Sequence, residues 1–327
     1  MASFRRILTR RVFNAIVTIL LIALVNFLLF RVMPGDPAAM YLPRNPDQDT
    51  MALYWANVER MELNGTLPEQ LVSYFIDTFT GEWGYSYLSK RPVTEVVAVA
   101  LSWTALLLTV SSVLTFLIGI ILGKTAARRR GKPADLVITG IGLFFYGMPI
   151  FWFGIMLMVL FSTELGILPS GGYITPGTYP SFDPAAMLDI AIHLVLPVAT
   201  LVIGGIAGII LIQRNSLIDV LTEDYITTAY AKGLSEKQVM RRHATQNARL
   251  PIVTTMAMDM AFILGGAFQV EWVFSYKGIG WVTIDAIGKK DYPVLQFVFL
   301  IGGIAVVLAN LIADLVLVKL DPRVSIT

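Results

Sequence analysis

Long uninterrupted runs of apolar residues constrain the fold of this chain more than any other feature of its sequence. Each of six runs reaches the ~20 residues that an α-helix needs to cross ~30 Å of hydrocarbon. They cover roughly residues 12–33, 97–123, 136–162, 190–212, 252–274 and 294–318. Only 15% of the 327 residues are charged, whereas about 25% is usual in soluble domains. The sequence therefore predicts an all-α, polytopic membrane protein with six transmembrane helices.

Basic residues near the ends of these runs set the expected orientation, because Lys and Arg accumulate in the cytoplasmic segments of membrane proteins. If the N-terminus is inside, the inner segments hold most of the Lys and Arg residues, including the Arg128–Arg130 cluster. We therefore expect both termini to be cytoplasmic. The expected segments are an N-terminal tail (1–11), a first span (12–33), a large extracytoplasmic loop (34–95), a core of five further spans (97–318) that contains an inner loop (213–251), and a C-terminal tail (319–327).

The segments expected outside the membrane contain few signals of regular structure. The large loop 34–95 is rich in Pro and Gly and holds more acidic than basic residues. We expect it to be an ordered but irregular cap, with one short amphipathic helix at 71–79. A second short helix is expected in the middle of the outer segment 275–293.

Composition and spacing exclude several kinds of chemical site. The chain has no cysteine, which rules out disulfides, thiolate catalysis and cysteine-ligated metals. His193 and His243 are the only histidines and fall on opposite sides of the predicted membrane, so we expect no metal site. The segment GIILGKT (119–125) has three residues between its glycines, where a phosphate-binding loop needs four. Because no nucleophile–base motif is present, we expect no catalytic site in this chain. We also expect no nucleotide site and no nucleic-acid partner.

Polar residues within the predicted spans are candidate functional residues, because ionisable groups are costly in lipid unless they face protein or water. Asp259 lies about two turns into the fifth span, with Met256 and Phe262 three residues before and after it on the same helix face. This set either lines a solute path or bonds a neighbouring helix, and the sequence leaves both possibilities open. A structural role is favoured for the residues nearer the span ends, which include Glu271, His193 and Asp314.

One charged, helix-prone segment interrupts the apolar runs: DYITTAYAKGLSEKQVMRRHATQNARLP, residues 224–251. Tyr225–Lys232 is expected to form a short helix, and Gly233 suits the left-handed residue that ends it. Ser235 and Gln238 fit a capping box for a second helix. The segment is thus predicted to form a helix, a sharp turn and a second helix on the inner face of the membrane.

The surface of this segment has two possible roles. It is expected to mix charges with the exposed side chains of Tyr225, Ile226, Thr228, Ala229 and Tyr230. Such a mixture is typical of a docking surface, but a solvated linker between two spans has the same composition. The residues alone leave both readings open.

The segment AYAKGLSEKQVMRRHATQNARLPIVT (229–254) resembles the EAA loop of ATP-binding-cassette (ABC) importer permeases, in the form used by the dipeptide/oligopeptide/nickel family. Further segments that match this family follow in the same order along nearly the whole chain: MPGDP (33–37), GEWGYSY (81–87), MPIFWFG (148–154), LGILPSGGY (165–173), HLVLP (193–197), GGAFQVEWVFSYKGIG (265–280) and DYP (291–293). The general permease motif has Glu-Ala-Ala where this chain has Thr227-Thr228-Ala229, and Ile-x-Leu-Pro where it has His243-Ala244-Thr245-Gln246. The second departure is usual for the peptide branch of the family.

The resemblance implies a function for the polar segment. In such importers the EAA loop forms a coupling helix that docks a cytosolic ATPase, and ATP binding rocks two permeases between inward-open and outward-open states. The positions that match the coupling motif are Tyr225, Thr228, Ala229, Lys232, Gly233, Ser235, His243 and Asn247. The resemblance also implies the six-span, type I importer arrangement, and a place in the inner membrane of a prokaryote. The implied partners are a second homologous permease that forms a heterodimer with this chain, two ATPase subunits that bind ATP and Mg, and an extracytoplasmic solute-binding protein.

Several questions stay open after the resemblance is taken into account. Relatives in this family carry dipeptides, oligopeptides, nickel complexes or oligosaccharides, and the sequence does not select one of these. A secondary transporter or channel, driven by an ion gradient without ATPase partners, is one alternative function. A membrane-embedded enzyme that uses Asp259 or Glu271 is the other, and the missing nucleophile–base set counts against it.

Overall fold

The computed structural model describes residues 2–32, 42, 45–60, 65–249, 251–256 and 267–320. Its helices in chain order are α1 (Ala2–Val32), α2 (Gln48–Arg60), α3 (Leu67–Thr80), α4 (Val93–Arg128), α5 (Pro133–Tyr146), α6 (Ile150–Met158), the π-helix η1 (Val159–Glu164), α7 (Pro184–Leu221), α8 (Asp224–Ala231), α9 (Glu236–Val239), the π-helix η2 (Met240–Ala244), α10 (Thr245–Asn247), α12 (Phe268–Val273), α13 (Ile279–Lys289) and α14 (Tyr292–Leu320). Within these described ranges there is no β-strand. The predicted all-α class is confirmed.

Four of the described helices are long and apolar enough to cross a membrane: Leu8–Arg31 within α1, all of α4, all of α7, and Tyr292–Ile312 within α14. The pair formed by α5 and α6–η1 would be a fifth span if it crosses as one unit. The fifth run predicted from the sequence, 252–274, is helical at 251–256 and in α12. Its middle, with Asp259 and Phe262, lies outside the described residues, so the count of six spans stays a prediction.

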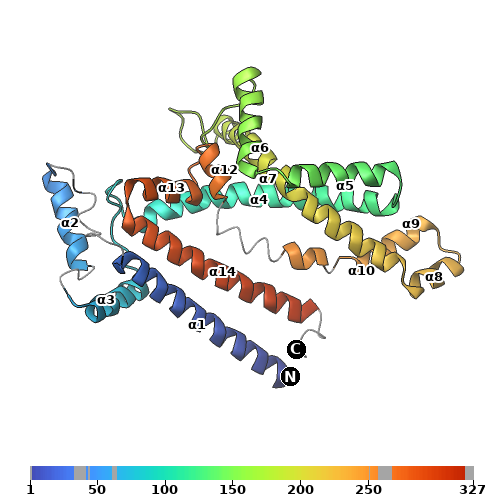
Figure 1. Ribbon diagram of the computed structural model, residues 1–327, viewed down its shortest axis with the longest axis horizontal. Helices are drawn as coiled ribbons and strands as arrows, with labels where there is room; N and C mark the ends of the chain where they lie inside the picture. The colour runs from blue at the N-terminus through green and yellow to red at the C-terminus, as the bar shows by residue number, and fades with distance from the viewer. Residues whose placement is uncertain are drawn as a thin grey trace.

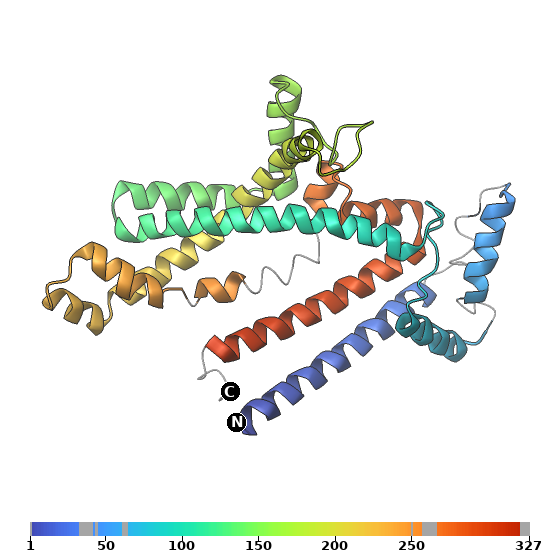
Figure 2. The same cartoon turned by 180° about the vertical axis from the view of Figure 1, so that it is seen from behind.

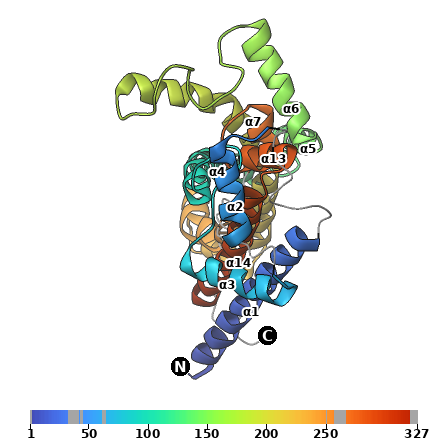
Figure 3. The same cartoon turned by 90° about the vertical axis from the view of Figure 1, so that its left-hand side faces the viewer.

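The third predicted span, 136–162, is not one continuous helix. α5 ends at Tyr146, and the chain turns through 97° before α6 begins at Ile150. Pro149 has an extended ψ of 123° at this point, and a proline disfavours the α conformation in the residue before it. α6 therefore projects sideways from the bundle, as both Figure 1 and Figure 3 show.

Small residues bring α4 and α7 into close contact along the centre of the bundle. A Cβ atom added to Gly119 would lie 2.7 Å from Ile209, and one added to Gly123 would lie 2.8 Å from Gln213. Small residues that allow backbones to approach are typical of helix crossings in membranes. Both glycines belong to the GIILGKT segment, so the structure shows a helix-packing role there and no phosphate-binding loop.

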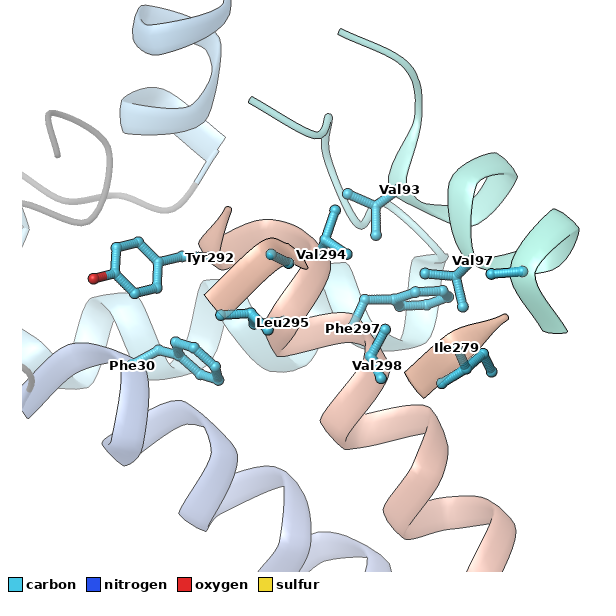
Figure 4. Packing of buried hydrophobic residues seen from close by; sticks show 11 residues of the cluster. Phe30, Val93, Val97, Ile279, Tyr292, Val294, Leu295, Phe297 and Val298 are labelled. Atoms are coloured by element: carbon cyan, nitrogen blue, oxygen red, sulfur yellow. The ribbon is translucent and has the colours of Figure 1, made fainter. Parts of the chain in front are cut away.

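α1 and α14 form a second pair, and they run side by side in Figures 1 and 2. At the end of α1 that holds Phe30, this pair meets α4 and α13 in a buried apolar cluster, shown in Figure 4. Phe30 of α1 packs edge-on against Tyr292, with ring centroids 6.1 Å apart. Asn26, which lies within the first predicted span, donates hydrogen bonds to the Tyr74 hydroxyl at 3.1 Å and to the Gln296 carbonyl oxygen at 2.9 Å. This polar residue therefore ties α1 to α3 and α14.

The segments expected outside the membrane are more helical than the sequence indicated. The helix expected at 71–79 is confirmed as α3, and the one expected within 275–293 is confirmed as α13. The helix α2 was not predicted, because we expected irregular structure in this part of the loop. At the other end of the chain, α1 begins at Ala2, so the residues expected to form a separate N-terminal tail continue the first helix.

A buried carboxylate fastens the segment between α3 and α4 to the start of α14. Asp291 accepts hydrogen bonds from the Ser86 hydroxyl at 2.5 Å and from the backbone N–H groups of Tyr87 at 3.2 Å and Leu88 at 3.3 Å. Burial raises the pKa of the Asp291 carboxyl, and these donors act in the opposite direction. The segments GEWGYSY and DYP, which resemble the permease family, are thus in contact.

Candidate functional site

The polar segment folds as two short helical arms joined by a tight turn. α8 is the first arm, and α9 continues through η2 and α10 as the second. We call residues 224–248 the polar hairpin. Figures 1 and 2 show it beyond the end of α7, at the opposite end of the molecule from α2, α3 and α13.

The turn of the polar hairpin has the geometry that its sequence predicts. Gly233 has a φ of +83°, a left-handed conformation that L-residues with a side chain rarely adopt. The N–H of Gly233 donates to the carbonyl oxygen of Tyr230 at 2.9 Å. The second arm begins with the expected capping box, in which the Ser235 N–H donates to Oε1 of Gln238 at 2.9 Å. The turn and both of its caps are confirmed.

A small apolar core holds the two arms together and fixes them to the membrane helices. It contains Ile226, Ala229, Val239, Met240, Ala244 and Ala248 of the hairpin, together with Leu217 of α7 and Ala127 of α4. Ile226 and Ala229 were expected on the exposed surface, and this expectation is wrong. Ala229 is only 4% exposed, because it lies three residues after Ile226 and so shares the inward face of α8.

Three of the predicted coupling residues lie on the outward face of α8 and at its C-cap, Lys232. Tyr225, Thr228 and Lys232 are exposed, and their spacing of three and four residues places them along one stripe of the helix. We call these three residues the α8 stripe. The Thr228 hydroxyl donates to the Asp224 carbonyl oxygen at 3.1 Å, so it is oriented within the helix.

Two further predicted coupling residues, His243 and Asn247, lie in the second arm of the hairpin. Asn247 donates from its amide nitrogen to the Tyr225 hydroxyl at 2.8 Å and to the His243 carbonyl oxygen at 3.0 Å. Tyr225 is thereby held by the second arm, while the residue as a whole stays 40% exposed. His243 lies in η2, and single-turn π-helices are frequent at functional sites.

An ion pair beside the hairpin was missed by sequence reasoning. Asp135 of α5 accepts two hydrogen bonds from Arg214 of α7, at 2.6 Å from Nε and 2.8 Å from Nη2. The N–H of Gly131 adds a third at 3.0 Å. Asp135 is the lone acid in the basic turn 124–135, which is the one sequence signal that marks it. This pair ties α5 to α7 three residues before Leu217, which lies in the hairpin core.

The predicted path residues are not brought into a described site. Met256 is exposed at the end of the helical residues 251–256. Asp259 and Phe262 lie outside the described residues, so their role stays a prediction. In the part of the chain that the structure describes, no group of three or more His, Asp or Glu side chains could hold a metal ion.

Glu271 has the structural role that its position near a span end favoured. Its side chain is completely buried, and it accepts hydrogen bonds from the Thr104 hydroxyl at 2.7 Å, the Gly280 N–H at 2.7 Å and the Trp281 N–H at 3.2 Å. Thr104 in turn accepts from the Ile279 N–H at 2.8 Å. The carboxylate therefore caps the first turn of α13 and ties it to α4 and α12. No solute reaches a carboxylate buried in this way, which counts against an enzyme that uses Glu271.

Comparison with known families covers almost the whole chain. Residues 115–326 match the family described as binding-protein-dependent transport system inner membrane component. Residues 4–109 match the N-terminal family of the same transport system membrane components. The first match includes the polar hairpin, and the second includes the outer loop with α2 and α3.

Curated relatives are similar over their full length. The oligopeptide transport system permease protein AppB of Bacillus subtilis (strain 168) is 32% identical, with 97% of this chain and 98% of that protein covered. A probable peptide ABC transporter permease, y4tP of Sinorhizobium fredii, is 34% identical over 96% of this chain and 97% of its own. The glutathione transport system permease protein GsiC of Salmonella choleraesuis is 33% identical, with the same coverage.

A solved structure shares the fold. A chain of the methionine ABC transporter MetNI, in an inward-facing conformation, superposes with a TM-score of 0.55. It covers 70% of this chain and 98% of that chain at 18% sequence identity. At this identity the likeness concerns the arrangement of helices alone.

Proposed function

Because the chain belongs to the family of binding-protein-dependent transport system inner membrane components, and is thus an ABC importer permease, we propose that its polar hairpin docks a cytosolic ATPase. The hairpin then passes the movement of the ATPase to the membrane helices. The spans surround half of the solute pathway, and a second, homologous permease supplies the other half.

The observation that carries this proposal is the shared core between the hairpin and two membrane helices. Leu217 of α7 and Ala127 of α4 belong to the same buried cluster as Ile226, Ala229 and Val239. Close-packed interiors transmit displacement because they deform little. A force on the α8 stripe therefore moves the inner ends of α4 and α7 together with the hairpin. A flexible linker would lack such a core.

The proposed assembly follows from this coupling. Two ATPase subunits bind ATP and Mg, since this chain carries no phosphate-binding loop and is not itself an enzyme. An extracytoplasmic binding protein delivers the solute to the outer side, where the loop 34–95 lies. We place six spans in the inner membrane of a prokaryote, with both termini and the hairpin in the cytoplasm, and Asp259 on the solute path.

We propose peptides as the solute class. Three similar permeases are named for oligopeptides, peptides and glutathione. All three names describe molecules that contain amide-linked amino acids. Uptake of dipeptides and longer peptides by the reconstituted transporter, with its own binding protein, distinguishes among them.

The docking role is tested by one substitution on the α8 stripe and a matched control. Thr228→Arg places a large charge on the exposed face of α8, and we expect it to abolish co-purification of the ATPase subunits and solute-stimulated ATP hydrolysis. Thr94→Arg makes the same change at an exposed position near the outer end of α4, and the ATPase should still co-purify. A Thr228→Arg complex with normal ATPase content and normal stimulation would show that the hairpin is only a linker.

A further inference from the structure

α3 exposes a row of large apolar side chains. Val72, Ile76 and Phe79 are 60%, 56% and 75% exposed, and their spacing of four and three residues places them along one side of the helix. The buried residues of α3, Gln70 and Tyr74, lie on its other side. We call the three exposed residues the α3 stripe. Exposed apolar side chains gathered in this way mark an interaction surface.

Both ends of α3 are defined by caps. At its start, the Thr66 N–H donates to Oε2 of Glu69 at 2.6 Å in a capping box. At its end, Gly81 has a φ of +85° and donates its N–H to the Asp77 carbonyl oxygen at 2.9 Å. The α3 stripe is therefore one face of a folded element.

The circumference of α3 divides into three faces. At 3.6 residues per turn, the α3 stripe lies roughly 140–160° from the buried Tyr74. The polar residues Ser73, Asp77 and Thr80 also follow a spacing of four and three residues, so they share a flank between those two faces. One face packs on protein, one is apolar and one is polar. A helix at the junction of protein, hydrocarbon and water needs these three faces.

The contacts of α3 with α1 set its level relative to the membrane. Tyr74 packs on Phe27, with ring centroids 5.6 Å apart, and its hydroxyl accepts a hydrogen bond from Asn26. The apolar span within α1 ends at Arg31. At 1.5 Å of rise per residue, Phe27 and Asn26 lie ~6–8 Å inside that end. α3 therefore packs on α1 at the level where hydrocarbon gives way to headgroups.

α1 also presents apolar side chains to its surroundings at this level. Val25, Leu28 and Leu29 are exposed, whereas Ala23 and Phe27 on the other side of the helix are buried. A helix that crosses a membrane turns such exposed apolar residues to hydrocarbon. The hydrocarbon around α1 thus reaches the level at which α3 packs.

We propose that α3 is an interfacial helix, with the α3 stripe immersed at the boundary between lipid headgroups and acyl chains. The apolar face of an interfacial helix enters this boundary by ~5–10 Å, in agreement with the level set by Asn26 and Phe27. α3 contains two acidic residues and no basic one, so attraction to anionic headgroups does not hold it there. Its contact with α1 and the burial of the stripe do. The stripe would meet lipid in either leaflet, so the orientation of the chain does not enter.

The test places single nitroxide labels on the transporter, assembled with cysteine-free partner subunits in phosphatidylcholine vesicles. This chain has no cysteine, so Val72→Cys and Ile76→Cys each provide one labelled site. Thr80→Cys is the matched control, exposed on the polar flank of the same helix. Electron paramagnetic resonance measures collisions of each label with oxygen, which dissolves in lipid, and with a water-soluble nickel chelate. We expect both stripe labels to lie about 5–10 Å below the lipid phosphates, and the Thr80 label to lie at or above them.

Two other results at the stripe labels would overturn the proposal. More frequent collisions with nickel than with oxygen would show that water covers the stripe. Low rates with both reagents would show that a protein covers it, such as the second permease or the binding protein. Phe79→Cys supplies a third stripe label if either variant fails to assemble. The measurement needs neither ATP nor solute, so its outcome is separate from that of the docking test on Thr228→Arg.

Discussion

The same substitution at two adjacent positions in α8 should destabilise the polar hairpin to very different extents. Ala229 lies in the hairpin core and is 4% exposed, whereas Thr228 lies on the exposed stripe. Arginine at position 229 must either bury its guanidinium among Val239, Ile226 and Leu217 or force the two arms apart. Arginine at position 228 extends into solvent. The pair therefore separates the folding of the hairpin from its docking.

The expected magnitude follows from the two environments. Overpacking a core costs about 1–3 kcal/mol, and desolvating an unpaired charge adds several kcal/mol. We therefore expect Ala229→Arg to destabilise the closed hairpin by at least about 3 kcal/mol. Thr228→Arg, an exposed substitution, should change this stability by no more than about 0.5 kcal/mol.

Hydrogen exchange measured by mass spectrometry checks both values on the full-length permease without its ATPase subunits, so that lost docking does not itself expose the hairpin. Because 1.4 kcal/mol corresponds to a factor of ten, amides of the second arm should exchange roughly a hundredfold faster in Ala229→Arg. In Thr228→Arg they should exchange within about threefold of the wild-type rate. Wild-type exchange in Ala229→Arg would refute the assignment of Ala229 to the core.

Three further predictions follow from described contacts. Gly233→Val should cost about 1–2 kcal/mol in hairpin stability, and Gly233→Asn clearly less, because asparagine tolerates a left-handed φ. Thermal unfolding and solute-stimulated ATP hydrolysis of both variants check this prediction. Equal losses in the two variants would contradict it. Thr104→Val should lower the free energy of unfolding by about 2–3 kcal/mol, since it leaves the buried N–H group of Ile279 and a buried carboxylate oxygen of Glu271 without their partner. An unchanged melting temperature in detergent would disprove the capping of α13 by Thr104 and Glu271. Asp135→Leu should lower the free energy of unfolding by about 3–5 kcal/mol, whereas the double variant Asp135→Leu with Arg214→Leu should recover much of this loss. Thermal unfolding of both variants checks the prediction. A double variant as unstable as the single one would argue against an isolated ion pair.

Local sequence rules succeeded where neighbouring residues decide the structure. The turn at Gly233 and the capping box at Ser235 depend only on backbone conformation within a few residues, and the sequence displays both. The long apolar helices were also predictable, because span length is set by bilayer thickness. Their ends were less predictable: α7 extends from Pro184 to Leu221, well beyond the apolar run at 190–212.

The bend between α5 and α6 shows why proline alone is not a sufficient signal. Pro149 separates two helices at 97°, whereas Pro197 lies inside α7, which continues past it without interruption. In a membrane protein, neighbouring helices can satisfy the backbone groups that a proline leaves unpaired. The outcome at each proline therefore depends on its packing partners, which the sequence does not identify.

Tertiary contacts account for the errors at the candidate site. The pattern of α8 defines an apolar face, but only the position of Leu217 shows that this face is covered by α7. Asp135 and Arg214 are separated by 79 residues, so no local rule pairs them. Both features depend on how α4, α5 and α7 come together near the polar hairpin.

Site-specific cross-linking tests the central claim most directly. A photoreactive phenylalanine analogue replaces Thr228 on the α8 stripe, and the assembled, ATP-hydrolysing complex is irradiated in its membrane. We predict a covalent adduct with the ATPase subunit from this position, and none from the same analogue at Tyr85, which is exposed in the segment between α3 and α4. Adducts from Thr228 that contain lipid or solvent products but no ATPase, in a complex that still hydrolyses ATP, would contradict the docking role of the polar hairpin.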